Sequence, residues 1–107
     1  MSRTYQAVKC ADGFSMSVQA GRGLYCSPRN DEGPYSEVEV GYPSWACPCL
    51  TPFAEDPERP AQTVYGYVPA DKIVKCIEAH GGIESGELPP LDILAALRHA
   101  AYRDAAV

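Results

Sequence analysis

Residues 63–83 read TVYGYVPADKIVKCIEAHGGI, and this stretch decides the fold class because a strand runs directly into a helix. Its opening residues, 63–68, are rich in β-branched and aromatic side chains and predict a strand. Gly66, in the middle of that strand, indicates a bulge or a close approach by another part of the chain.

The next element is a helix, predicted over residues 70–80. Pro69 has a backbone angle suited to a first helical turn, and apolar side chains then recur at helical spacing. They are Ala70, Ile73, Val74 and Ile77. Gly81 and Gly82 predict a left-handed cap, with Ile83 folding back against the last turn.

Three further strands are predicted upstream, over residues 4–9, 14–19 and 36–42. In the last two, apolar and polar side chains alternate as they do in a strand with one buried face. The alternating apolar residues are Phe14, Met16 and Val18 in one strand and Val38, Val40 and Tyr42 in the other. Asp12 and Gly13 favour the positive φ angles of a tight turn, so the first two strands are expected to form a hairpin.

A second helix is predicted over residues 91–104, after two prolines. Its expected inward face consists of Ile93, Leu94, Leu97 and Ala101. Strands therefore precede helices along the chain, which predicts an α+β fold: about four mostly antiparallel strands with both helices packed on one face. A chain of 107 residues is expected to form a single domain over residues 1–107.

The charge balance excludes some classes of partner. The formal net charge is −5, from 14 acidic and 9 basic residues. Direct nucleic acid binding is not expected, because affinity for phosphates requires clustered Lys and Arg. No apolar run is long enough for a secretion signal or a membrane span, so a cytoplasmic protein with no membrane contact is predicted.

Five cysteines are scattered through the chain, at positions 10, 26, 47, 49 and 76. An odd number cannot all pair, and Cys47-Pro48-Cys49 is too tight for an ordinary disulfide, so reduced thiols are expected. Usual zinc templates contain at least two closely spaced ligand pairs. One C-P-C with isolated cysteines and His80 or His99 matches none of them, and neither a metal nor another cofactor is predicted.

Cys26 is the candidate nucleophile, because it follows Tyr25 in a polar loop and His80 or His99 could serve as its base. Both histidines also have simpler explanations. His80 falls in the last turn of a helix, where it can bond exposed carbonyls, and His99 falls on a polar helical face. No catalytic residue is therefore predicted, and the chain is not expected to be an enzyme.

The most distinctive feature of the composition is the stretch from Asn30 to Glu58, which carries seven acidic residues and no Lys or Arg. The seven are Asp31, Glu32, Glu37, Glu39, Glu55, Asp56 and Glu58. Strand alternation places Glu37 and Glu39 in solvent, without the burial that acid–base catalysis requires. If the carboxylates converge, they would attract a basic protein surface. If they do not, they form an ordinary solvated surface.

This chain resembles a group of small proteins encoded by phages and prophages in three runs: CSPRNDEGPYSEVEVGYPS (26–44), AEDPERPAQTVYGYVP (54–69) and EAHGGI (78–83). The Cys47-Pro48-Cys49 run is not part of the resemblance. Small acidic phage proteins are often anti-defence factors, including anti-CRISPR proteins that occupy a nucleic-acid groove. The resemblance implies the cytoplasm of a bacterial host cell and assigns no catalytic residues.

The leading hypothesis is a non-enzymatic, anti-CRISPR-like inhibitor that binds a basic surface of a bacterial defence protein, such as a Cas protein. The acidic stretch would supply the charge, and Tyr35 and Trp45 would supply aromatic contacts. The alternative is a protein that sequesters a nucleotide, with Arg22 and Arg29 on the phosphate and Tyr25 on the base. A third hypothesis, a cysteine-dependent enzyme, predicts an unusually reactive thiol at Cys26.

Overall fold

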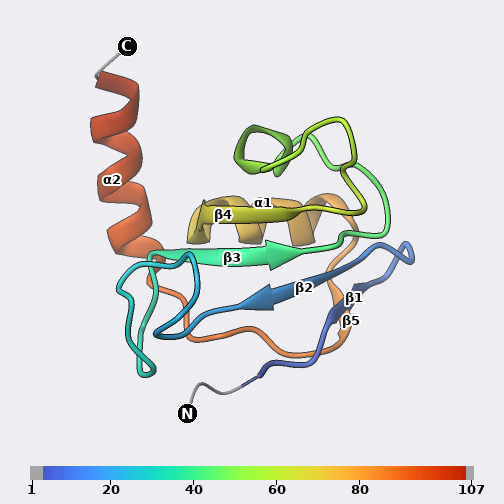
Figure 1. Cartoon of the computed structure of the whole chain (residues 1–107), viewed down its shortest axis with the longest axis horizontal. Coiled ribbons are helices and arrows are strands. Elements are labelled where there is room, and N and C mark those ends of the chain that lie inside the picture. Colours follow the sequence, from blue (N-terminus) through green and yellow to red (C-terminus); the bar gives the residue numbers. More distant parts are fainter. Residues whose placement is uncertain (1–3, 106–107) are drawn as a thin grey trace.

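The computed structural model describes residues 4–105 and has the predicted α+β fold, with one five-stranded antiparallel sheet and two α-helices (Figure 1). The strands are β1 (Val8–Cys10), β2 (Ser15–Gln19), β3 (Glu37–Gly41), β4 (Val64–Pro69) and β5 (Ile83–Ser85). The helices are α1 (Ala70–Ala79), α2 (Ile93–Ala105) and a short 3-10 helix, η1 (Thr51–Phe53). The strands lie side by side in the order β4-β3-β2-β1-β5.

The end of α1 confirms the predicted glycine cap but corrects the expected position of Ile83. Gly81 has a φ of 91°, and the N–H of Gly82 donates to the carbonyl of Ile77 at 2.9 Å, as in a Schellman motif. Ile83 does not fold back on the helix. It is exposed and begins β5, where it pairs with Cys10 of β1. Three exposed residues carry no alternation, so the sequence contained no signal for this strand.

Gly66 lies at both a bulge and a close approach of another segment, the two features that its place in the strand predicted. The register between β3 and β4 shifts between Val38 and Val40, and a Cβ added at Gly66 would lie 3.3 Å from the Cβ of Tyr25. The N–H of Tyr67 also donates to the carbonyl of Tyr25 at 3.0 Å. A bulge in β4 therefore allows the loop of residues 20–36 to pack closely against the sheet.

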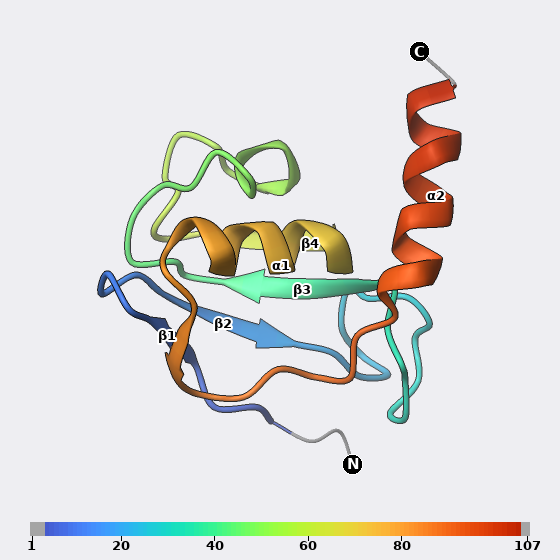
Figure 2. The same ribbon diagram turned by 180° about the vertical axis from the view of Figure 1, so that it is seen from behind.

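Helix α1 lies along the sheet, and Figure 2 shows it in front of β4 and alongside β3 when the molecule is seen from behind. Its predicted apolar stripe is largely confirmed, since Ala70, Ile73 and Ile77 are buried. Alternate residues of the strands meet this stripe. The buried strand residues include Val8, Met16, Val18, Val38, Val40, Tyr65 and Val68.

Helix α2 stands at the end of the sheet rather than flat on its face, and both views agree on this (Figures 1 and 2). Asp92 caps it, because its side chain accepts the N–H of Ala95 at 3.0 Å. The predicted inward positions Leu94 and Leu97 are wrong: they are 70% and 49% exposed, whereas Ala96 is buried. Helix α2 packs against α1 rather than on the sheet face, so Leu94 and Leu97 remain in solvent. No helix among the described residues is long and apolar enough to cross a membrane.

Candidate functional site

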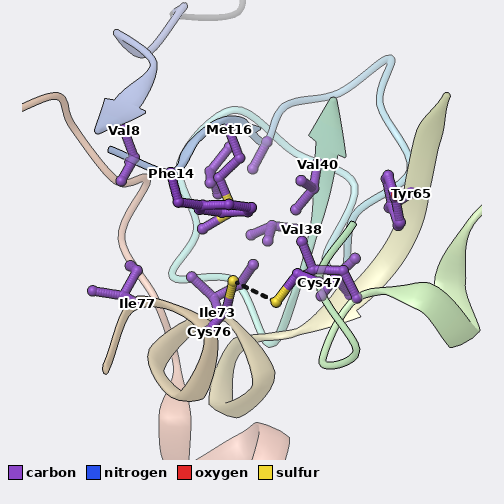
Figure 3. Packing of buried hydrophobic residues seen from close by; sticks show 14 of the residues in the cluster. Val8, Phe14, Met16, Val38, Val40, Cys47, Tyr65, Ile73, Cys76 and Ile77 are labelled. Carbon is purple, nitrogen blue, oxygen red and sulfur yellow. Dashed lines mark hydrogen bonds between the residues drawn. The ribbon is translucent and has the colours of Figure 1, made fainter. Parts of the chain in front are cut away.

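Three side chains with metal-ligating atoms meet inside the protein. The sulfurs of Cys47 and Cys76 and a ring nitrogen of His80 all lie within 4.8 Å of one another. The two sulfurs are 3.4 Å apart, and Figure 3 shows them pointing toward each other from a loop and from α1. Cys47 is 3% exposed and Cys76 is fully buried. We call these three residues the Cys–His cluster.

Cys47 belongs to the long loop between β3 and β4, where a tight turn holds its backbone. Its carbonyl accepts hydrogen bonds from the N–H of Leu50 at 2.9 Å and from the N–H and hydroxyl of Thr51 at 3.1 and 3.0 Å. Leu50 is itself fully buried and part of the core. The turn therefore anchors the loop and directs the Cys47 sulfur inward.

Cys76 and His80 come from the C-terminal half of α1. They are four residues apart, a spacing that brings two side chains onto one face of a helix. His80 is the C-cap residue, and its N–H donates to the carbonyl of Cys76 at 3.2 Å. The helix thus presents a thiol and an imidazole together to the Cys47 loop.

Asp12, in the turn between β1 and β2, orients the His80 ring. The Nδ1–H of His80 donates to Asp12 Oδ2 at 2.7 Å. Two backbone bonds lock this arrangement: the N–H of Phe14 donates to Asp12 Oδ1 at 2.9 Å, and the N–H of Asp12 donates to the His80 carbonyl at 3.2 Å. Because Nδ1 is engaged with a carboxylate, Nε2 is the ring nitrogen left for a second partner.

Two aromatic side chains, Phe14 and Trp45, pack against the same imidazole. Phe14 stacks on His80 with ring centroids 3.9 Å apart and an interplanar angle of 4°. Trp45 meets His80 edge to face at 5.9 Å. The His80 side chain is 12% exposed, so the Cys–His cluster is largely buried but still reaches solvent at the His80 ring.

The two buried thiols have opposite pKa shifts. Burial acts to raise the pKa of Cys47, but hydrogen bonds from His80 and Cys76 outweigh it and hold that pKa below its usual value. Burial and the neighbouring Cys47 both raise the pKa of Cys76. These directions indicate that the Cys76 thiol donates to the Cys47 sulfur, which is the group best able to carry negative charge.

His80 and Asp12 shift in the directions expected for an ion pair. Burial acts to lower the pKa of His80, but its bonds to Asp12 and Cys47 outweigh this and raise it. The hydrogen bond from His80 and that from the Phe14 N–H lower the pKa of Asp12. The arrangement can therefore stabilise positive charge between a carboxylate and a sulfur.

The acidic stretch is divided among separate parts of the surface. Glu37 and Glu39 are half-buried on the sheet face opposite α1. Asp31 lies in the 20–36 loop, where it accepts the N–H of Arg22 at 2.8 Å and pairs with its guanidinium at 4.0 Å. Glu32 is exposed in the same loop. Glu37 and Glu39 thus form the only part of the stretch that is carried by a strand of the described sheet.

The remaining acids lie in the loop beyond the β4 edge of the sheet (Figure 1). Glu55 donates its N–H to the carbonyl of Val64 at 3.0 Å, and Asp56 is 4.0 Å from the guanidinium of Arg59. Glu58 lines a hollow of about 320 Å³. The hollow is also lined by Trp45, Ala46, Arg59, Pro60, Ala61 and Gln62. Trp45 therefore stands between this hollow and the Cys–His cluster.

The prediction that Tyr35 contacts a partner is corrected by its burial. Only 1% of Tyr35 is exposed, and its hydroxyl donates to the carbonyl of Asn30 at 2.9 Å. Its backbone pairs with Leu91, just before α2. Tyr35 therefore joins the 20–36 loop to the base of α2 and belongs to the core.

The residues of the nucleotide hypothesis all lie in the 20–36 loop. Arg22 and Arg29 are exposed, and Arg22 is paired with Asp31. Tyr25 is exposed and lies 5.9 Å from Tyr67, ring centroid to ring centroid. The role of these three residues as nucleotide ligands stays a prediction.

Cys26 lies apart from the histidines that were weighed as its base. It is fully buried, and its thiol donates to the carbonyl of Gly21 at 3.2 Å. His80 is bonded to Asp12 instead, and His99 is exposed on α2. The cysteine that lies beside a histidine is Cys47, which belongs to the C-P-C run that matched no usual zinc template.

One signal for this site was present in the sequence. Cys76 and His80 lie four residues apart on a helix that periodicity predicted, which is the spacing of a two-ligand helical metal motif. No signal connected Cys47 or Asp12 to them. Comparisons with protein-family models, curated proteins and solved structures found no match, so the chemistry of the site is derived from its geometry.

Proposed function

We propose that this protein is a zinc-binding module whose metal is held by the Cys–His cluster. Two sulfurs bound at about 2.3 Å to one tetrahedral zinc ion lie about 3.8 Å apart. The sulfurs of Cys47 and Cys76 are 3.4 Å apart, and His80 lies within 4.8 Å of both. Small side-chain adjustments would therefore place all three ligands at bonding distance.

Asp12 is the observation that carries the proposal, because it completes the environment of a metal-bound histidine. A histidine that ligates zinc almost always donates its other ring N–H to a carboxylate or carbonyl, which fixes its tautomer and orientation. The 2.7 Å bond between His80 Nδ1 and Asp12 Oδ2 has this form. Since Nδ1 is bonded to Asp12, Nε2 is the ring nitrogen left to bind a metal.

Burial favours metal binding over catalysis by a thiol. A nucleophilic sulfur must reach a substrate, but Cys47 is 3% exposed and Cys76 is fully buried. The separation of 3.4 Å also differs from the bond length of a disulfide, about 2.05 Å. A small cation needs far less access than a substrate, and the His80 side chain of the cluster is 12% exposed.

Bound zinc would connect three segments that are distant in sequence. Cys47 belongs to the β3–β4 loop, Cys76 and His80 to α1, and Asp12 to the β1–β2 turn. Structural zinc sites contribute directly to folding free energy, and their ligands are deprotonated when the metal binds. The proposed biochemical role of the metal is to hold this loop on the domain.

Metal analysis of the purified chain tests the proposal. The protein is prepared under reducing conditions, saturated with zinc and dialysed, and one zinc ion per chain is expected. Cys47→Ser and Cys76→Ser should lose the metal, whereas Cys26→Ser, the matched control at another buried cysteine, should keep it. Metal-free protein, or equal zinc content in all three variants, would overturn the proposal. Rapid alkylation of Cys47 without any metal would instead support thiol catalysis.

As a second candidate function, we propose inhibition of a bacterial defence protein through contact with a basic surface. The outer face of β3 supports it, because the N–H of Tyr25 donates to Glu39 at 3.3 Å and places two exposed tyrosines, Tyr25 and Tyr67, beside that carboxylate. Exposed tyrosines next to carboxylates suit lysine and arginine side chains. The net charge of −5 favours the same partners.

Binding to purified CRISPR effector complexes, measured at two salt concentrations, tests this second candidate. Glu37→Lys with Glu39→Lys should weaken binding strongly, and the residual binding should be less sensitive to salt. The matched control reverses Glu78 and Glu84, which are exposed elsewhere. Binding that survives reversal of Glu37 and Glu39 would exclude this face as the contact.

A further inference from the structure

The two sulfurs of the Cys–His cluster are placed to bond to each other as well as to a metal. The Sγ atoms of Cys47 and Cys76 are 3.4 Å apart, and Figure 3 shows them pointing toward each other. A disulfide bond is about 2.05 Å long, so the two atoms would have to approach by about 1.4 Å. Both cysteines are free thiols, and the other three, Cys10, Cys26 and Cys49, lie outside the cluster.

We propose that Cys47 and Cys76 are a redox-active pair, which hydrogen peroxide converts to a disulfide with release of the zinc ion; the release rests on the zinc-binding function proposed above. A thiolate binds zinc, whereas a disulfide sulfur carries no negative charge and is not a zinc ligand. After oxidation, His80 would be the one ligand of the cluster left, and a single imidazole does not retain the ion. The metal and the disulfide therefore exclude each other.

The chemistry requires one peroxide molecule for each pair. The Cys47 sulfur attacks one oxygen of the peroxide, the O–O bond breaks, and Cys47 becomes a sulfenic acid while the other oxygen leaves as water. The Cys76 sulfur then attacks the Cys47 sulfur, the S–S bond forms, and the hydroxyl group leaves with the Cys76 proton as a second water. The two sulfurs lose two electrons, which the peroxide gains. When both thiolates start on zinc, the two protons come from solvent.

The place of Cys47 in the chain makes it the sulfur that peroxide reaches first. Its neighbours Ala46 and Pro48 are exposed, so Cys47 turns inward from a segment that lies on the surface. The adjacent His80 side chain is 12% exposed, whereas Cys76 is fully buried on α1. Hydrogen peroxide is small and uncharged, so it enters a buried site without the desolvation cost of a charge. Cys76 then has only to reach the Cys47 sulfur beside it.

Oxidation would change the site without detaching the loop. The disulfide would link the β3–β4 loop to α1, the same two segments that the zinc ion would hold. It would leave His80 bonded to Asp12 but free of the metal. Trp45, the single tryptophan of the chain, lies 5.9 Å from the His80 ring, centroid to centroid, and lines the hollow of about 320 Å³. Its fluorescence should therefore report the state of the pair.

Peroxide titration of the full chain tests the inference, with the zinc-loaded and the metal-free protein treated in parallel. One equivalent of hydrogen peroxide should lower the number of free thiols from five to three, as counted with a chromogenic thiol reagent after denaturation. A chromophoric chelator should record release of one zinc ion per disulfide formed, and peptide mass mapping should identify the Cys47–Cys76 link. Dithiothreitol should restore all five thiols and zinc binding.

Two variants provide the controls. Cys26→Ser removes another buried cysteine and should still lose two thiols to the disulfide. Cys76→Ser removes the second sulfur of the pair and should form no disulfide at the same peroxide dose. Far-ultraviolet circular dichroism confirms that each variant has folded before its thiols are counted.

The outcomes separate this inference from the proposed function. Zinc-bound protein that keeps five thiols and its metal, with a metal-free form that also keeps five, would overturn the redox pair and leave zinc binding intact. Oxidation of the metal-free form alone would overturn the metal release, and a disulfide that uses Cys10 or Cys49 in place of Cys76 would overturn the assignment. If the Cys47–Cys76 disulfide forms in a chain that never binds zinc, the proposed function fails and the metal release fails with it.

Discussion

The acidic stretch is continuous in the sequence but divided in the fold, whereas the Cys–His cluster is scattered in the sequence but brought together by the fold. The acids follow one another from Asn30 to Glu58, yet the fold divides them between the outer face of β3, the 20–36 loop and the loop beyond β4. The cluster residues are scattered along the chain, yet their ligand atoms meet within 4.8 Å. A run of acidic residues in the sequence therefore does not by itself define a candidate site. The Cys–His cluster is a candidate site because its ligand atoms come together inside the protein.

The strongest test of this contrast is to remove the metal. Because the proposed ion joins the Cys47 loop to α1, zinc should stabilise the protein by about 4 kcal/mol when free zinc exceeds the Kd about 1,000-fold. Addition of a chelator should therefore lower the Tm markedly. Denaturant titrations with and without zinc measure the difference, and Cys47→Ser should respond to neither addition. Equal stability with and without zinc in wild-type protein would contradict a structural metal.

The next effect concerns Asp12, which positions the histidine without binding the ion. Asp12→Asn keeps the side-chain shape but replaces the carboxylate that accepts the Nδ1–H of His80 at 2.7 Å. Zinc affinity should fall about 10- to 100-fold, as is typical when such a partner is lost. Competition with a chromophoric chelator measures it. Asp56→Asn, at an exposed carboxylate of the acidic stretch, should leave zinc affinity unchanged.

A smaller effect is expected where the 20–36 loop crosses the bulge in β4. In Gly66→Ala the new Cβ would lie 3.3 Å from the Cβ of Tyr25, so the loop must shift. We expect a loss of about 1 kcal/mol in the free energy of unfolding, as for mild overpacking. Gly23→Ala is the control, because its Cβ would have no atom within 4 Å. Similar unfolding midpoints for the two variants would show that the contact at Gly66 is loose.

The smallest effect should come from charge reversal on the outer face. Glu37→Lys with Glu39→Lys changes two partly exposed side chains on the outer face of β3, of which Glu39 accepts one exposed hydrogen bond, from the N–H of Tyr25 at 3.3 Å. Folding stability should change by less than about 0.5 kcal/mol, which thermal unfolding can measure, and zinc affinity should stay the same. A large loss of stability would mean that these carboxylates belong to the structure rather than to a binding surface.

Local patterns were enough for most of the fold. Alternation located β2 and β3, helical spacing located α1, and Gly81 marked its end, because each depends on neighbours along the chain. The same patterns failed where packing decided the outcome. Leu94 and Leu97 look like an inward stripe, but α2 packs against α1 rather than on the sheet face and leaves them in solvent.

Such local patterns could predict only part of the candidate site. The spacing of Cys76 and His80 on one helix was readable, but the choice of Cys47 over Cys26 was not. Both cysteines lie in irregular loops, and both are buried. The tight turn at Leu50 and Thr51 directs Cys47 toward α1, while Cys26 bonds to Gly21 in its own loop.

The sequence by itself determined that this is an acidic chain with an α+β fold in which four strands precede two helices, because hydrophobic periodicity and charge are local properties of a polymer. The short strand β5, between the two helices, lies outside what periodicity could predict. Only the tertiary structure decided which of the five cysteines meet a histidine and which carboxylate orients that histidine. Those outcomes depend on how loops and helix ends pack around a common core, and contacts between distant segments leave no trace in local periodicity.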